Sequence, residues 1–119
     1  MSFEVVTAVF PDYVRVAAFG EYSLEQLFEF INSIKIEALK AKRDRVLIDP
    51  IGVAGKMTEA DRFMAGRHIA DVFGPSLKAA CVMQAEDITK LGELTAVNRG
   101  ARFFVTSSEM EALKWLLQP

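Results

Sequence analysis

Hydrophobic residues recur with two different periods along the chain, and these periods predict an alternation of strands and helices. Residues 3–10 and 13–19 are rich in Val, Phe and Tyr, and the turn signal Pro11-Asp12 lies between them. They predict an antiparallel hairpin that Gly20 closes. Residues 46–48 and 77–83 are almost continuously apolar, which is typical of strands buried on both faces. We expect the first of these strands to stop at Asp49-Pro50. We also expect a last strand over residues 101–105.

Four other segments carry apolar residues at helical spacing, and three of them begin with a capping signal. Ser23, Thr58 and Ser108 are each followed three residues later by a polar or acidic side chain, which is typical of a helix start. Gly74-Pro75 ends the second helix and Gly100 the third. The residues expected to face inward are Leu24, Leu27, Phe28, Ile31, Ile34 and Ala38, then Phe63, Gly66, Ile69, Ala70 and Phe73, then Ile88, Leu91 and Leu94, and last Ala112, Leu113 and Leu116.

The resulting order, ββαβαβαβα, predicts an α/β fold. Strands joined by helices run parallel, so we expect a mixed, mostly parallel five-stranded sheet with helices on both faces and the hairpin toward one edge. No repeat, low-complexity stretch or Pro/Gly/Ser-rich linker divides residues 1–119, which predicts a single domain.

Composition narrows the classes of function. The chain is 51% hydrophobic and has a formal net charge of −2, which gives no broad positive field for nucleic acid or anionic lipid. Cys81 is the one cysteine, so no internal disulfide can form, and a reducing, cytoplasmic compartment is favoured. No apolar run approaches the roughly 20 residues that cross a bilayer, and the start has no basic segment before an apolar one. We therefore expect a cytoplasmic protein with no integral membrane segment and no nucleic-acid partner.

The residues with reactive side chains do not form a known catalytic pattern. Residues 52–58 follow a strand and precede a helix, but a phosphate-binding loop needs Gly where Pro50 stands and Ser or Thr where Met57 stands. His68 is expected to face solvent, and Cys81 lies in an apolar run, where a thiol packs as a small hydrophobic group. Glu86 and Asp87 are expected to stabilise the start of the third helix. The sequence predicts no enzyme, no cofactor and no metal site.

Two segments near the carboxyl end, together with the element order and the strand ending Leu47-Ile48-Asp49, carry a family resemblance. They are Asn98-Arg99-Gly100-Ala101-Arg102-Phe103-Phe104 and Glu111-Ala112-Leu113-Lys114-Trp115-Leu116. With them the whole chain resembles the SpoIIAA-like family of small bacterial STAS-type domains, named for sulfate transporters and anti-sigma-factor antagonists. Some members are grouped with the lipid-binding CRAL-TRIO fold. The resemblance implies the fold and, for regulatory members, a phosphorylated Ser or Thr at the start of the helix after the central strand. Thr58 stands there, without the usual preceding Asp and following Gly.

Two functions remain open. The resemblance favours a non-enzymatic regulatory module that binds a protein partner through the second helix and residues 51–58. The alternative is a module that binds a small apolar ligand or lipid beyond the carboxyl ends of the parallel strands. The candidate partner-binding or ligand-binding residues are Asp49, Ile51, Gly52, Gly55, Thr58, Met64, Gln84 and Thr106. Phe30 and Ile36, on or beside the outer face of the first helix, predict a symmetric homodimer.

Overall fold

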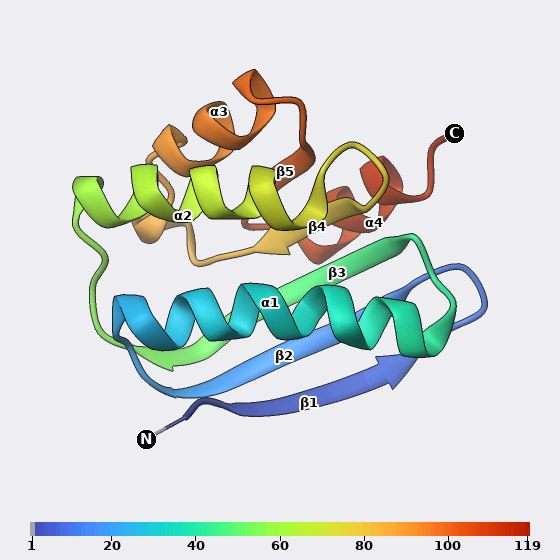
Figure 1. The fold of residues 1–119 in the computed structure, drawn as a ribbon, viewed down its shortest axis with the longest axis horizontal. Coiled ribbons are helices and arrows are strands. Elements are labelled where there is room, and N and C mark those ends of the chain that lie inside the picture. Colours follow the sequence, from blue (N-terminus) through green and yellow to red (C-terminus); the bar gives the residue numbers. More distant parts are fainter. Residues whose placement is uncertain (1) are drawn as a thin grey trace.

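The computed structural model describes residues 2–119 as one sheet with helices on both of its faces (Figure 1). The elements in chain order are β1 (Glu4–Val9), β2 (Val14–Glu21), α1 (Leu24–Ala41), β3 (Arg45–Ala54), α2 (Glu59–Phe73), β4 (Lys78–Val82), the short 3₁₀ helix η1 (Ala85–Asp87), α3 (Leu91–Asn98), β5 (Arg102–Thr106) and α4 (Glu109–Leu116).

The strands lie side by side in the order of the chain, β1-β2-β3-β4-β5. β1 pairs with β2 antiparallel, and the other three pairs are parallel. The predicted mixed five-stranded sheet, with the hairpin at one edge, is therefore confirmed. The predicted helix starts are confirmed as well, because Ser23, Thr58 and Ser108 each accept a hydrogen bond from the backbone N–H three residues ahead.

Alternate residues of the central strands divide between two hydrophobic clusters. Val46 and Ile48 of β3 belong to the larger cluster, which includes residues of α1, α2 and α3. Leu47 of β3 and Ala80 of β4 point the other way, into a smaller cluster with Ala112 and Leu116 of α4. Figure 1 shows α1 and α2 side by side over the same face of the sheet. Both faces of the centre are thus buried, as continuous apolar strands require.

The predicted end of β3 at Asp49-Pro50 is wrong, since β3 continues to Ala54. Its pairing with β4 stops at Ile48, so Pro50, which has no N–H, lies where no donor to β4 is needed. The continuation pairs with β2, where Gly52, Val53 and Ala54 face the end of that strand beyond an irregularity in register. A partner on one side is enough to carry the strand past the proline.

Three of the predicted side-chain positions are also corrected. Phe30 is buried, with 3% exposure, because Phe3 packs edge-on against it at 6.2 Å between ring centroids. Phe63 is 40% exposed because it lies at the margin of the buried stripe of α2. Leu94 is 56% exposed, since the short α3 buries Thr95 and Ala96 instead. Ile36 is exposed as expected.

Candidate ligand-binding site

A cavity of about 430 Å³ lies between the sheet and the helices α1, α2 and α3, whose buried residues belong to the larger hydrophobic cluster. Its wall includes residues from α1, α2, α3, η1, β5 and the carboxyl-end halves of β3 and β4. The exposed lining residues mark its mouth: Ile51, Ala54, Gly55, Lys56, Gln84, Thr89 and Lys90. They follow or end the parallel strands β3 and β4, the edge at which open α/β sheets bind ligands.

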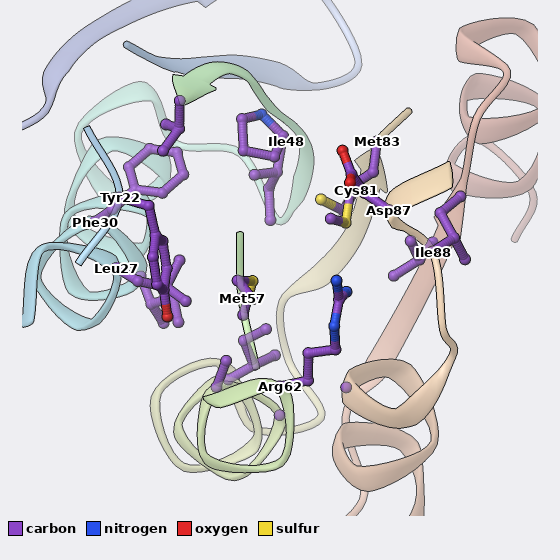
Figure 2. A pocket seen from close by; sticks show the side chains of 18 of the residues that line it. Tyr22, Leu27, Phe30, Ile48, Met57, Arg62, Cys81, Met83, Asp87 and Ile88 are labelled. Carbon is purple, nitrogen blue, oxygen red and sulfur yellow. The ribbon is translucent and has the colours of Figure 1, made fainter. Parts of the chain in front are cut away.

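The interior of the cavity is apolar. Its buried wall consists of aliphatic and aromatic side chains from both helices and sheet: Phe30, Ile31, Ile34, Ile48, Ile69, Phe73, Phe103 and Val105. Figure 2 shows Tyr22, Leu27 and Phe30 on one side and Cys81, Met83 and Ile88 on the other, with Met57 between them. Burial raises the pKa of the Cys81 thiol to about 12, and the nearby charge of Asp49 adds to the shift. The thiol is therefore neutral at physiological pH.

Two polar contacts connect the segments around the mouth. The Tyr22 hydroxyl, at the end of β2, donates a hydrogen bond to Asp61 Oδ2 of α2 at 2.8 Å. Desolvation and this hydrogen bond raise the pKa of Tyr22 above its usual value. Lys56, in the loop before α2, pairs with Asp87 of η1 at 3.0 Å. Asp87 also lines the cavity. The expectation that Asp87 and Glu86 stabilise the start of α3 is wrong, because both residues lie in η1, and residues 88–90 separate η1 from that helix.

Arg62 brings a charged group into this apolar space. Its side chain is 12% exposed, and Figure 2 shows it extending from α2 toward Cys81. Arg62 Nε lies 3.1 Å from Glu59 Oε1, but its N–H does not point at that oxygen, so the buried Nε has no hydrogen-bond partner within residues 2–119. A guanidinium is always charged at physiological pH, so a largely buried cation faces the cavity.

The structure brings together part of the set of residues named from the sequence. Ile51, Gly55 and Gln84 line the cavity. The remaining five lie outside its lining: Asp49, Gly52, Thr58, Met64 and Thr106.

Each of these five has another place in the fold. Asp49 pairs with Arg15 on the α4 side of the sheet, and Thr106 donates a hydrogen bond to Glu111 of α4. Gly52 lies against the Phe19 ring, where a Cβ would come within 2.2 Å of the ring. Thr58 caps α2, and Met64 is exposed on that helix.

His68 lies outside the cavity lining and is not the solvent-facing residue that the sequence predicts. It is half-buried between α1 and α2, because its ring stacks on Phe28 at 4.5 Å and its Nε2 lies 2.8 Å from Asn32 Oδ1. Within residues 2–119, no group of three or more His, Cys, Asp and Glu side chains could hold a metal ion. None of the helices in that range is long and apolar enough to cross a membrane.

Sequence reasoning missed Arg62, although a signal was present. On a 100° helical wheel Arg62 falls in the middle of the stripe formed by Gly66, Ile69 and Phe73. A charged residue among buried positions is rarely found without a partner, so its place in the stripe marks it as a candidate site residue.

Known structures resemble this fold over nearly its whole length. An anti-sigma factor antagonist from Mycobacterium paratuberculosis covers 98% of this chain and 96% of its own, with a TM-score of 0.63 and 14% identity. An uncharacterised protein with a SpoIIAA-like fold from Shewanella loihica PV-4 covers 97% and 94%, with a TM-score of 0.56 and 19% identity. No protein-family model and no curated protein sequence matches the chain. At these identities the likeness concerns the architecture alone: the chain has a SpoIIAA-like fold, as the resemblance implied.

Proposed function

We propose that the chain is a non-enzymatic, cytoplasmic SpoIIAA-like module whose cavity binds a small, largely apolar ligand. The observation that carries the proposal is the cavity of about 430 Å³ with an apolar interior. Ligand sites in proteins span roughly 300–1,000 Å³ and are lined mainly by apolar side chains with a few polar groups. The position of the cavity at the carboxyl ends of β3 and β4 supports the same function.

The states of the reactive groups favour binding over catalysis. Cys81 lines the cavity, but a thiol with a pKa of about 12 is a poor nucleophile at physiological pH. The Tyr22 hydroxyl donates its proton to a hydrogen bond with Asp61, and its pKa is raised. His68 lies outside the lining. None of these three groups is therefore placed to attack or deprotonate a molecule in the cavity at neutral pH.

Blocking the cavity tests the proposal. Val53 is half-buried in β3 and lines the cavity, so Val53→Trp places an indole in the space that a ligand needs. Val97→Trp adds the same side chain to an exposed position of α3 outside the lining. We expect the neutral fluorophore 1-aminoanthracene to bind the unaltered protein and Val97→Trp and to bind Val53→Trp at least tenfold more weakly.

Thermal unfolding provides a second readout, because a ligand of the native state raises the apparent stability by about 2.7 kcal/mol at a hundred times its Kd. Native mass spectrometry of the purified protein would reveal a retained ligand. The proposal fails if the fluorophore leaves the melting temperature unchanged and no small molecule is retained. It also fails if a folded Val53→Trp binds the fluorophore as well as Val97→Trp does.

A second candidate function is binding of a protein partner through α2. Phe63 and Met64 are each 40% exposed on this helix, soon after its cap Thr58. Apolar side chains that remain exposed together are typical of interaction surfaces. The similar protein described as an anti-sigma factor antagonist supports a regulatory role of this kind.

Substitutions on this surface test the second candidate. Met64→Arg should abolish capture of a partner, as should Thr58→Glu, which introduces a charge at the cap. Met110 of α4 is 80% exposed, so Met110→Arg is the matched control and should leave capture of the partner unchanged. A partner that is captured equally by all three variants in quantitative pull-downs would contradict the assignment to α2.

A further inference from the structure

The charged side chains around the cavity pair with one another, except for one. Lys56 pairs with Asp87 at 3.0 Å and Lys90 with Glu93 at 2.8 Å, and all four residues line the cavity. Glu93 also accepts the Val105 N–H. Asp87 and Glu93 thus already have basic partners. Among residues 2–119, this leaves Arg62 as the lining cation whose acidic partner is not part of the lining.

The nearest acid to Arg62 does not compensate its charge well. Glu59 lies outside the cavity lining, and its side chain is 61% exposed, so water screens the pair. The distance of 3.1 Å between Nε and the carboxylate is short, but no hydrogen bond joins them. A largely buried guanidinium whose Nε has no hydrogen-bond partner within residues 2–119 is costly, and an anion inside the cavity would supply a partner.

From this charge pattern we infer that the ligand is a carboxylic acid with an apolar tail, whose carboxylate pairs with Arg62. The inference rests on the proposed function of the cavity. A guanidinium presents its N–H groups in a planar fork that matches the two oxygens of a carboxylate. The tail would lie against the apolar walls formed by α1, α2 and the sheet. The Arg62 guanidinium and that wall line the same cavity, so one molecule can contact both.

Three probes that share one tail isolate the contribution of the head group. Decanoic acid, 1-decanol and decylamine carry a negative, a neutral and a positive head at pH 7.5, and each can displace 1-aminoanthracene. We expect the protein to bind decanoate at least tenfold more tightly than decanol, and decylamine most weakly. Arg62→Met keeps an unbranched side chain without the charge, and it should bind decanoate no more tightly than decanol while still binding decanol.

Two further variants separate Arg62 from general charge effects. Arg67→Met removes a cation from an exposed position of the same helix and should keep the preference for decanoate. Arg62→Lys retains the charge but loses the planar fork, so it should keep a reduced preference. If Arg62→Met does not fold, as judged by circular dichroism, Arg62→Lys decides the role of Arg62.

The outcomes distinguish this inference from the proposed function. If decanol binds as tightly as decanoate, the inference about the head group is overturned while the cavity remains a ligand site. A preference for decanoate that persists in Arg62→Met, or that is undiminished in Arg62→Lys, overturns the role of Arg62. If the fluorophore does not bind, none of the three probes raises the melting temperature and no small molecule is retained, the proposed function fails and the inference fails with it.

Discussion

Gly66 of α2 lies in such close contact with α3 that even one added methyl group should destabilise the protein. A Cβ at this position would lie 2.5 Å from the carbonyl oxygen of Gly92 and 2.8 Å from Thr95 Cβ. The first of these atoms belongs to the backbone of the other helix and cannot rotate away. Gly66→Ala therefore forces α2 and α3 apart, and it displaces the wall of the cavity that both helices form.

Two opposing effects set the size of the change. Replacing glycine by alanine inside a helix favours the helix by about 1 kcal/mol. Overpacking in a closely packed contact costs about 1–3 kcal/mol, and backbone contact at 2.5 Å places this position at the upper end. The free energy of unfolding should therefore fall by about 1–2 kcal/mol. A chain of 119 residues loses about 4 °C of melting temperature per kcal/mol, so the shift should be roughly 4–8 °C downward.

Urea unfolding followed by circular dichroism measures this change, and the facing glycine provides the matched control. A Cβ on Gly92 would lie 3.3 Å from the Arg62 carbonyl oxygen, which a small adjustment can relieve. Gly92→Ala should therefore change the free energy of unfolding by less than about 1 kcal/mol. If Gly66→Ala is as stable as the unaltered protein, or more stable, the close approach of α2 and α3 is refuted.

Three other perturbations probe the rest of the fold. Leu116→Ala truncates a fully buried side chain of α4 and should lower the free energy of unfolding by about 2–5 kcal/mol in urea titrations. A loss below about 1 kcal/mol would contradict the packing of α4 against the sheet. Burial raises the pKa of Cys81 from 9.0 to about 12, so above pH 9 the unfolded state loses the thiol proton before the folded state does. The free energy of unfolding should therefore fall by up to roughly 1.4 kcal/mol per pH unit until about pH 12. Cys81→Ala should lack this part of the alkaline loss, and equal slopes for both proteins would contradict the burial of the thiol. Sedimentation at rising concentration tests for a homodimer through α1. Ile36 is 53% exposed on this helix, so Ile36→Glu should dissociate such a dimer. A dimer that is unaltered by this substitution would place the contact elsewhere.

The element order could be predicted from the sequence because most of its signals are local. The caps at Ser23, Thr58 and Ser108 and the turn at Pro11-Asp12 each depend on a few neighbouring residues, and the structure has an element boundary at each of them. The end of β3 could not be predicted in this way. Its continuation past Pro50 depends on pairing with β2, more than 30 residues away in the sequence, and a local stop signal carries no information about that pairing.

The candidate site was predictable in position but not in composition. The rule that ligands lie beyond the carboxyl ends of parallel strands identified Ile51 and Gln84. It also included Asp49 and Thr106, which belong to the α4 side, because the rule does not say to which face of the sheet a side chain points. The size of the cavity depends on the distances between helices, and a single sequence does not contain them.

The cavity and the poorly compensated charge of Arg62 give stability and binding opposite requirements in the same place. An apolar cavity forgoes contacts that a packed core would make, and a largely buried charge whose Nε has no hydrogen-bond partner within residues 2–119 adds a further cost. Both costs fall on the side of the sheet that holds α1, α2 and Arg62, whereas the cluster beneath α4 contains fully buried side chains such as Leu116. A ligand that occupied the cavity and paired with Arg62 would relieve both costs at once, so the free energy of binding would include the removal of these costs. Replacing Arg62 by an apolar residue should accordingly make the free protein more stable while it weakens the binding of an acid, the relation expected of a residue kept for binding rather than for folding.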